Sequence, residues 1–326
     1  VKKGWRKMSE PKKMNIANIP TPIQKVNFKG TQFLIKRDDL TGSLLSGNKI
    51  RKLEYILPDV KKKKADYLFT CGGDQSNHAR ATAVSAKQIG VKTKLFLWGS
   101  NTNNADGNLF LDKLSGSEIK YLTKKQYENV TTEMISDSKR LQKKGKKVYV
   151  LPSGGSTPLG IWGYINFMRE LNEQIDLKKI SGILSSVGSG GTSAGMLLGA
   201  AMLGLNLKIY GVNVVDNAET TLAIIVELVE ACMEEYNLKV KVDYNNLVIL
   251  DGYSAEGYKS IADNKLKLIK ELFQSTGILL DPTYTGKAFY AYHENFLKVK
   301  KRSSILFLHT GGIFGIFSKR RKYLGV

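Results

Sequence analysis

The chain has few of the residues from which proteins build cross-links and metal centres. Its 326 residues include only two cysteines, Cys71 and Cys232, and neither belongs to a CxxC pair. The three histidines, His78, His293 and His309, lie too far apart along the sequence for metal-ligand spacing. The sequence therefore predicts neither a disulfide framework nor a metal site, and such cysteine usage is typical of a reducing cytoplasm.

Long apolar runs are also missing. Residues 183–205 and 220–233 are the most apolar segments, and Gly, Ser or Glu interrupts each of them before it reaches the roughly 18 apolar residues of a membrane span. Residues 1–19 are rich in lysine and lack the apolar core of a signal peptide. We therefore expect no membrane contact and a cytoplasmic location.

Acidic residues are scarce relative to basic ones, because 29 Asp and Glu stand against 50 Lys and Arg and give a formal net charge of +21. Such an excess can indicate a nucleic-acid partner. Here the excess is mostly lysine, is spread over segments such as 61–64, 143–147 and 319–322, and is not interleaved with aromatic residues. We expect a solvated lysine surface and no nucleic-acid partner, although a basic chain also attracts anionic small molecules.

The sequence does contain a regular alternation of strand-like and helix-like segments. Hydrophobic residues make up 42% of the chain and charged residues 24%, as in ordinary globular proteins, and the length allows two domains. Residues 1–31 look extended and irregular. We predict strands at 32–36, 67–71, 94–98, 118–122, 147–151, 180–187, 208–214, 247–251 and 304–309, and helices at 79–89, 106–114, 126–144, 158–171, 217–235, 262–274 and 288–296. This alternation predicts an α/β fold of doubly wound, mainly parallel sheets.

The segment SGNKIRKLE, which begins at Ser46, predicts an unusual environment for one lysine. Ser46 and Gly47 indicate a turn, and Asn48 is a candidate helix N-cap. Apolar residues then recur at helical spacing from Ile50. Lys49 would lie in the first helical turn, where the positive end of the dipole disfavours an ammonium. If apolar neighbours also desolvate the side chain, its neutral amine becomes available for Schiff-base chemistry. The alternative is an ordinary surface lysine.

Four polar turns follow predicted strands or precede predicted helices, where α/β proteins gather binding groups. They comprise residues 76–78, 188–192, 281–286 and 310–312. The glycines of 188–192 allow several backbone N–H groups to point into one concavity at a helix start, which suits a phosphate. The segment is not a Walker A loop, and Ser193 stands where the GxGxxG pattern requires its third glycine. A glycine turn that merely closes a βα unit is the alternative.

Together with Lys49, these turns resemble the fold-type II pyridoxal-phosphate (PLP) enzymes, specifically the D-cysteine desulfhydrase / 1-aminocyclopropane-1-carboxylate (ACC) deaminase family. The matching stretches are IKRDDLTG, SGNKIRKLEY, CGGDQSNHAR, GNLFLDKL, PSGGSTPLG, VGSGGTSAGM, DPTYTGKA and LHTGG. The resemblance implies a tryptophan-synthase-β-like fold with PLP in a cleft between two doubly wound α/β domains. It implies a large domain of residues 1–46 plus 161–326, a small inserted domain of residues 47–160, and a homodimer that acts on a small amino acid.

The resemblance also implies the site residues. The cofactor-binding set is Lys49, Asn77, Gly188, Ser189, Gly190, Gly191, Thr192 and Thr310; the substrate-binding set is Gln75, Ser76, His78 and Tyr284; the catalytic set is Lys49, Ser76, Tyr253 and Tyr284. Lys49 would hold PLP as the internal aldimine, and Asn77 would hydrogen-bond the 3′-oxygen of the cofactor. Taken alone, Ser76 is equally a helix cap, and His78 and the tyrosines are equally packing residues. Tyr258 lies close to Tyr253 in the sequence.

Two positions separate the branches of this family. In the ACC deaminase branch, Glu follows the Tyr of DPxYxG and the last motif reads HLGG; here Thr285 and Thr310 occupy these positions, as in the D-cysteine desulfhydrase branch. A carboxylate facing the pyridine nitrogen makes a strong electron sink for cyclopropane opening, whereas a hydroxyl makes a weaker one. The resemblance therefore implies α,β-elimination of D-cysteine to pyruvate, ammonia and hydrogen sulfide. ACC deamination and lyase action on D-serine, 3-chloroalanine or a sulfonated analogue are the alternatives.

Overall fold

The computed structural model describes residues 10–215, 217–298 and 304–325, and its strands form two sheets. In spatial order, the large sheet contains β1 (Ile23–Phe28), β2 (Thr31–Arg37), β10 (Ile305–His309), β7 (Gly182–Val187), β8 (Lys208–Asn213) and β9 (Leu247–Leu250). The small sheet contains β5 (Glu118–Leu122), β4 (Lys92–Trp98), β3 (Tyr67–Gly73) and β6 (Val148–Val150). Only β1 and β2 pair antiparallel within these described sheets. The predicted α/β fold of two mainly parallel sheets is confirmed.

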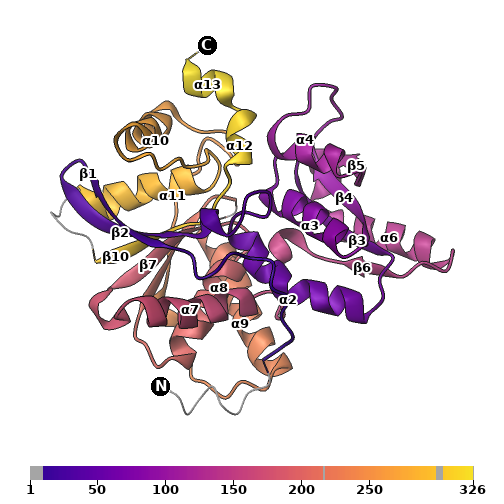
Figure 1. Ribbon diagram of the computed structural model, residues 1–326, viewed down its shortest axis with the longest axis horizontal. Helices are drawn as coiled ribbons and strands as arrows, with labels where there is room; N and C mark the ends of the chain where they lie inside the picture. The colour runs from indigo at the N-terminus through magenta and orange to yellow at the C-terminus, as the bar shows by residue number, and fades with distance from the viewer. Residues whose placement is uncertain (1–9, 216, 299–303, 326) are drawn as a thin grey trace.

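Helices cover both faces of the large sheet (Figure 1). One face carries α7 (Trp162–Gln174), α8 (Gly191–Met202) and α9 (Ala218–Glu235), and the other carries α10 (Asp263–Thr276), α11 (Thr285–Tyr292) and the π-helical turn η5 (His293–Leu297). Strand β10 contributes to both cores, because Leu306 and Leu308 pack on the α7–α9 side while Ile305 and Phe307 pack on the α10–α11 side. A strand buried on both faces is continuously apolar, which explains the sequence ILFLH.

The small sheet lies beside the large one, with helices packed around it (Figure 1). These helices are α2 (Asn48–Lys62), α3 (Asn77–Gln88), α4 (Gly107–Leu114), α5 (Lys124–Tyr127) and α6 (Val130–Gln142). The remaining described elements are two short helices, α12 (Phe314–Phe317) and α13 (Arg320–Leu324), and four 3-10 turns, η1 (Asp38–Leu40), η2 (Ser153–Gly155), η3 (Leu177–Lys179) and η4 (Tyr244–Asn246). The single helix predicted for 126–144 is wrong. A capping box of Thr123 with Gln126 starts α5, which ends before α6 begins. The domain boundaries at 46/47 and 160/161 stay a prediction.

The prediction of an irregular segment over residues 1–31 is also wrong in part, since residues 23–28 form β1. Lys29 and Gly30 connect β1 to β2 and have φ values of 50° and 81°. Positive φ at both central residues is the geometry of a type I′ hairpin turn, which matches the twist of the two strands. The prolines at positions 20 and 22 precede β1, so they leave its hydrogen bonds intact.

Helix α2 contains a proline, and the N-terminal segment compensates for it. Pro58 has no N–H with which to bond the carbonyl of Glu54. The backbone N–H of Met14 donates to that carbonyl at 2.8 Å instead. The Glu54 side chain then accepts from the N–H groups of Ile16 and Ala17, both at 3.0 Å. The segment before β1 is thereby fixed along α2, the helix that carries Lys49.

Arg51 connects α2 to the large sheet through a buried ionic network. Its guanidinium donates to both carboxylate oxygens of Asp38 at 2.8 Å and to Glu170 at 2.8 and 3.0 Å. The Tyr164 hydroxyl donates to Asp38 at 2.6 Å, and the Lys36 ammonium donates to Glu170 at 2.6 Å. Burial alone would raise the pKa of Asp38, but the charge and hydrogen bonds of Arg51 outweigh burial and hold that pKa below its ordinary value.

Replacing Arg51 with methionine should destabilise the fold, because two carboxylates would lose their buried partner. We expect a loss of about 3–5 kcal/mol in the free energy of unfolding, measured by urea denaturation at pH 7. Lys179→Met is the matched control, since Lys179 pairs with Asp176 at 3.8 Å on the exposed surface. That change should cost less than about 1 kcal/mol.

The same network predicts a pH dependence for the parent protein. Asp38 and Glu170 both have depressed pKa values, so their contribution is complete above the unfolded-state value of about 4. It should be lost as the pH falls from there through the folded-state values. An Arg51→Met protein as stable as the parent at pH 7 would contradict this account of the network.

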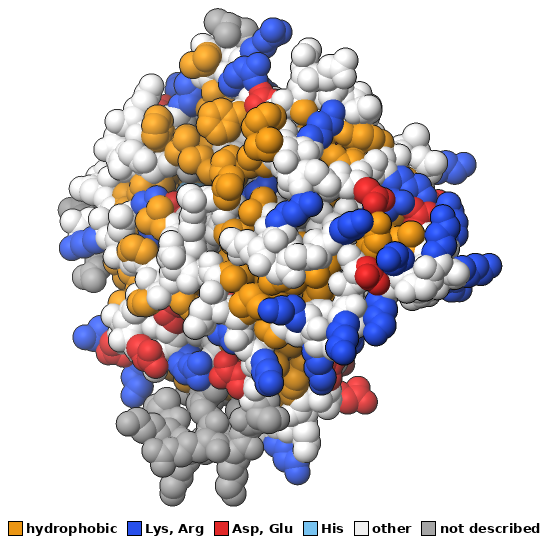
Figure 2. Space-filling model, turned by 45° about the vertical axis from the view of Figure 1, so that its right-hand side comes forward, with side chains coloured by type: hydrophobic (Ala, Val, Ile, Leu, Met, Phe, Trp, Pro, Cys, Tyr) orange, Lys and Arg blue, Asp and Glu red, His pale blue; other side chains and the backbone are white. Residues whose placement is uncertain are grey.

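The surface carries many basic side chains, as predicted. Figure 2 shows Lys and Arg side chains over the visible face, most densely on the side of the small sheet. The runs 61–64 and 143–147 are exposed. Within the described ranges, no helix combines the length and apolarity needed to cross a bilayer.

Candidate active site

Loops and helix starts from both sheets converge on one cavity at the carboxyl ends of β7 and β10. The cavity has a volume of about 430 Å³ with its open mouth included. Its walls are formed by Asn48, Lys49, Lys52, Asn77, residues 186–193, Tyr284, Thr310 and Gly311. Parallel strands end beside helix N-termini at this edge of a sheet, which is where α/β proteins bind ligands. The structure thus brings the four predicted turns together around Lys49.

The N-cap prediction for Asn48 is wrong, because Gly47 is the N-cap of α2. Gly47 has a φ of 93°, and a Cβ at this position would lie 2.7 Å from the carbonyl oxygen of Thr310. Only glycine tolerates both the angle and the close approach. Asn48 donates its backbone N–H to the same carbonyl at 3.0 Å and its side-chain amide to Thr192 Oγ1 at 3.0 Å. Asn48 therefore holds the start of α2 against β10 and the glycine loop.

Lys49 is the second residue of α2 and faces the cavity. Among the residues that the structure describes, none makes a hydrogen bond or ion pair with its amine. Burial lowers the pKa of Lys49 to about 8. At pH 7.5 roughly a quarter of such amines are neutral, against about one in a thousand for a free lysine. The desolvation predicted for Lys49 is present, and it supplies the neutral amine that Schiff-base chemistry requires.

The loop 188–192 and Lys52 lie together at the cavity beside Lys49. The loop leads into α8, whose first backbone N–H groups have no partner within the helix. A Cβ on Gly191 would lie 2.5 Å from Ser156 Oγ and 2.7 Å from Lys52 Nζ, so the ammonium reaches the loop directly. Burial, and then the charge of Lys49, lower the pKa of Lys52 well below its ordinary value. An anion bound here would restore the charge on Lys52.

Asn77 presents a hydrogen-bond donor to the cavity. It is the first residue of α3, and its Oδ1 accepts from Asn108 Nδ2 at 2.9 Å. The Nδ2 group of Asn77 has no partner among the described residues. A ring oxygen in the cavity would therefore meet a donor here, as the resemblance implies for Asn77.

The neighbours of Asn77 in the turn are held by internal hydrogen bonds. Ser76 is the N-cap of α3, and its Oγ accepts from the N–H of Ala79 at 3.2 Å. The Gln75 side chain accepts from the N–H of Asn108 at 2.9 Å and donates to the carbonyl of Asp106 at 2.9 Å. Ser76 is thus the helix cap that the sequence allows, and Gln75 fixes the start of α4. Binding of the substrate carboxylate by this turn stays a prediction.

His78 is buried and does not line the cavity. The Thr70 hydroxyl donates to the carbonyl of Leu151 at 3.0 Å, so it accepts from His78 Nε2, which lies 2.8 Å away. Burial lowers the pKa of His78 well below its ordinary value, and the charges of Lys49 and Lys52 lower it further. The structure therefore does not bring His78 to the position expected of a substrate ligand. A contact of His78 with the substrate stays a prediction.

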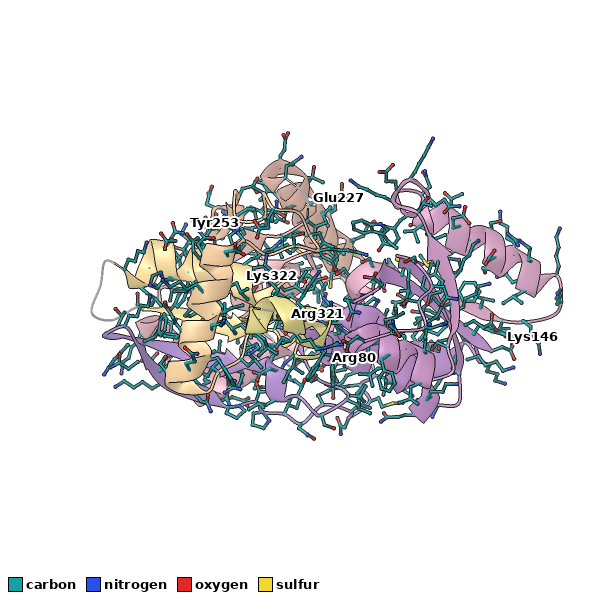
Figure 3. All side chains as sticks on the ribbon, turned by 90° about the horizontal axis from the view of Figure 1, so that it is seen from above. Arg80, Lys146, Glu227, Tyr253, Arg321 and Lys322 are labelled. Atoms are coloured by element: carbon teal, nitrogen blue, oxygen red, sulfur yellow. The ribbon has the colours of Figure 1, made fainter. Side chains whose placement is uncertain are left out.

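Tyr284 and Tyr258, not Tyr253, meet at the cavity. Tyr284 lines the cavity, its hydroxyl is hydrogen-bonded to that of Tyr258, and the two ring centroids are 5.7 Å apart. The Tyr253 hydroxyl instead accepts from Asn295 Nδ2 at 2.7 Å, and its ring packs against Tyr290. Figure 3 shows Tyr253 over the large sheet's helices, well away from the junction of the two sheets. The structure does not bring Tyr253 to the cavity as predicted, and Tyr258 is the tyrosine that lies beside Tyr284.

Asp281 fixes the turn that presents Tyr284. Its buried carboxylate accepts from the N–H groups of Thr283 and Tyr284 at 2.9 Å and of Thr285 at 2.7 Å. The Thr285 hydroxyl also donates to Asp281, at 2.6 Å, and Thr285 does not line the cavity. Burial, and then the neighbouring Tyr258, raise the pKa of Tyr284 well above its ordinary value. The Tyr284 hydroxyl is therefore protonated at neutral pH.

Thr310 and Ser186 supply hydroxyls to the cavity wall. Their side-chain oxygens lie 3.4 Å apart at the ends of β10 and β7. No Asp or Glu from the described part of the chain lines the cavity. The two side chains that present hydroxyls to the cavity at these strand ends are therefore uncharged.

These features, a desolvated lysine and a glycine loop at a helix start that line one cavity, point to a class of protein. The model of the pyridoxal-phosphate-dependent enzyme family matches residues 15–311, so the chain is a pyridoxal-phosphate-dependent enzyme. It is 42% identical over 307 residues to a putative 1-aminocyclopropane-1-carboxylate deaminase of Thermotoga maritima, which covers 93% of this chain and 97% of that relative.

Two further comparisons identify the family within the pyridoxal-phosphate-dependent enzymes. The chain is 35% identical over 323 residues to the mitochondrial bifunctional D-cysteine desulfhydrase/1-aminocyclopropane-1-carboxylate deaminase of Arabidopsis thaliana, covering 94% of this chain and 79% of that relative. The crystal structure of an ACC deaminase homologue matches with a TM-score of 0.88 and 35% identity, covering 97% of this chain and 96% of that one. The chain belongs to the ACC deaminase / D-cysteine desulfhydrase family of fold-type II PLP enzymes.

The residues present fit pyridoxal phosphate. The neutral amine of Lys49 suits its aldehyde, and the start of α8 with Lys52 suits its phosphate. The donor of Asn77 suits its ring oxygen, and the hydroxyl of Thr310 suits its ring nitrogen. The aldehyde, the phosphate, the ring oxygen and the ring nitrogen of PLP would thus each meet a matching protein group.

Sequence reasoning missed Lys52, Ser186 and Asn108. Lys52 follows Lys49 by three residues on one helix, so helical spacing alone places both on one face. Ser186 and Asn108 meet their partners only through tertiary contacts, and no local pattern signals either of them.

Proposed function

We propose that the protein catalyses α,β-elimination on a small amino acid that carries a leaving group on Cβ, and that D-cysteine is its substrate. The reaction consumes one water and releases pyruvate, ammonia and hydrogen sulfide. The observation that supports this proposal is the chemistry of the cavity wall, where Thr310 and Ser186 offer hydroxyls and no described carboxylate is present. Hydroxyls beside the ring nitrogen make a weaker electron sink than a carboxylate, and this is sufficient when a thiol departs.

The chain's own residues supply the proton transfers. Pyridoxal phosphate, when bound, provides a sink for the electron pair left at Cα. Lys49 takes up the α-proton, because its amine is unpaired in the described structure and has a pKa of about 8. Tyr284 donates a proton to the departing sulfur, since its side chain lines the cavity and its hydroxyl is protonated at neutral pH. Tyr258 holds that hydroxyl in place, and the turn around Ser76 receives the substrate carboxylate.

ACC deamination is the second candidate. It is favoured by the names of the Thermotoga maritima relative and of the bifunctional Arabidopsis thaliana relative, both similar over more than nine-tenths of this chain. The two reactions share proton removal or addition beside the same cofactor, and they differ in whether a ring C–C bond or a C–S bond breaks.

A substrate panel on the PLP-loaded protein separates these candidates. D-cysteine, L-cysteine, ACC, D-serine and 3-chloroalanine would each be assayed for 2-oxoacid, and the cysteines also for sulfide. We expect D-cysteine to give sulfide and pyruvate in equal amounts, with kcat/KM at least about tenfold above that for ACC. Comparable turnover of ACC would contradict the choice of substrate, and a preference for L-cysteine would contradict its chirality.

A further inference from the structure

A buried arginine lies close to the cofactor site and has no role in the chemistry described above. Arg80 belongs to α3, and its side chain is fully buried. Its Nε donates to Asn108 Oδ1 at 3.2 Å, its Nη2 donates to the carbonyl of Ser46 at 3.3 Å, and its Nη1 donates to the carbonyl of Leu44. Figure 3 shows Arg80 where the small sheet's helices meet the C-terminal segment. Burying a guanidinium without a hydrogen-bonded carboxylate is costly, so a specific use is expected.

The contacts of Asn108 leave its side-chain amide only one orientation. Arg80 can only donate, so the atom of Asn108 that faces it is the oxygen. The carbonyl of Gln75 can only accept, so the atom 3.0 Å from it is the nitrogen. The same Nδ2 lies 2.9 Å from Asn77. Neither of the two fixed partners can exchange roles, and Asn108 is fully buried away from water.

The orientation of Asn108 in turn determines that of Asn77. An asparagine amide can present either its oxygen or its NH2 group after a half-turn about its last bond. Because Asn108 offers a donor, Asn77 must direct Oδ1 towards it and NH2 into the cavity. We infer that Arg80 and Asn108 are positioning residues that fix Asn77 as a hydrogen-bond donor to the ring oxygen of the bound cofactor. This inference rests on the proposed function only in taking PLP as the bound cofactor. It does not depend on which substrate the enzyme uses.

There is also a physical reason why the residue that orients Asn108 and, through it, Asn77 is an arginine. A neutral partner such as glutamine could rotate and accept, and only the Gln75 carbonyl would then hold the orientation of Asn108. A guanidinium has no acceptor atom, so the polarity of every amide beyond it is set. The cavity therefore offers a donor in every molecule, instead of a mixture of donor and acceptor.

Asn108→Asp tests this inference, because it replaces the NH2 group by an oxygen of the same size. Asn77 must then turn its NH2 group towards position 108 and its oxygen into the cavity. We expect PLP binding to weaken by roughly 10–100-fold, and the visible absorbance of the bound cofactor to change in position. The measurement is titration of the apoprotein with PLP, followed by absorbance and tryptophan fluorescence. Asn104→Asp, the same change at an exposed position of the small-sheet part, is the matched control and should bind PLP like the parent.

A double-mutant cycle separates positioning from general support of the fold. If Asn108 acts through Asn77, Asn108→Asp should cost nothing further in an Asn77→Ala background. Arg80→Gln, which leaves only the Gln75 carbonyl to orient the Asn108 amide, should show a smaller loss with the same dependence on Asn77. It keeps the test decisive should Asn108→Asp fail to fold.

Two results would overturn the inference. One is PLP binding by Asn108→Asp and Arg80→Gln that matches the parent, and the other is an equal loss with and without Asn77. In either case the contacts of Asn108 would serve packing alone. Because the readout is cofactor binding, a parent protein inactive on D-cysteine would refute the proposed substrate while the binding constants still decide the role of Asn108.

Discussion

Replacement of Lys49 by alanine should abolish turnover and remove the visible absorbance of bound PLP. The cavity offers its aldehyde-reactive amine at this position, because Lys49 is desolvated, unpaired in the described structure and placed at the start of α2. The same amine is the group assigned to take up the α-proton. We therefore expect kcat to fall by about 10⁴-fold, measured as 2-oxoacid release from D-cysteine, with the visible band lost from the purified protein.

A lysine elsewhere on the same helix provides the control. Lys62 lies in the last turn of α2 and is exposed, so Lys62→Ala should keep both the colour and the activity of the parent. Borohydride reduction of the parent should attach the cofactor to Lys49. Attachment to another lysine, or colour that survives in Lys49→Ala, would contradict the assignment.

The pKa of Lys49 gives this prediction a pH dependence. Only the neutral amine reacts with an aldehyde, and burial lowers the pKa of Lys49 to about 8. The rate at which apoprotein captures PLP should therefore rise about tenfold per pH unit below 8 and level off above it. An ordinary surface lysine would show a rate that continues to rise towards pH 10. Stopped-flow absorbance on the apoprotein distinguishes the two profiles.

The sequence was most informative where one segment determines its own geometry. The strand predicted at 118–122 has the bounds of β5, and the turns at the ends of β7 and β10 lie where parallel strands must end together. Lys49 could be singled out because its place at a helix start is a local property. The hairpin β1–β2 was missed because its turn residues, Lys29 and Gly30, lack the usual Asn-Gly signal.

The site residues that sequence reasoning misplaced depend on contacts between distant segments. Tyr253 and Tyr258 are five residues apart in an irregular connection, and no periodicity indicates which ring points to Tyr284. Arg80 and Asn108 lie 28 residues apart and meet only when α3 and α4 pack together. Such pairs are set by tertiary packing, and one sequence read by local pattern carries no signal for them.

Tyr284→Phe should lower kcat for D-cysteine by roughly 10²–10³-fold, since the departing sulfur would lose its proton donor. Tyr258→Phe should cost about tenfold, because Tyr258 contributes only the hydrogen bond that holds the Tyr284 hydroxyl. Tyr253→Phe is the matched control and should stay within about twofold of the parent, since its hydroxyl contacts Asn295 and not the cavity. Steady-state release of sulfide and pyruvate measures all three variants.

The leaving group offers a sharper test of the same role. Chloride departs without a proton, whereas hydrosulfide, the group that leaves D-cysteine when its C–S bond breaks, is more basic and benefits from one. If Tyr284 is the proton donor, Tyr284→Phe should lower turnover of 3-chloroalanine by no more than about threefold while D-cysteine suffers the full loss. Equal losses on the two substrates would contradict this role, because Tyr284 would then act before the bond to the leaving group breaks. In that case its hydroxyl, held protonated by burial and by Tyr258, would serve to position the amino acid for proton removal by Lys49.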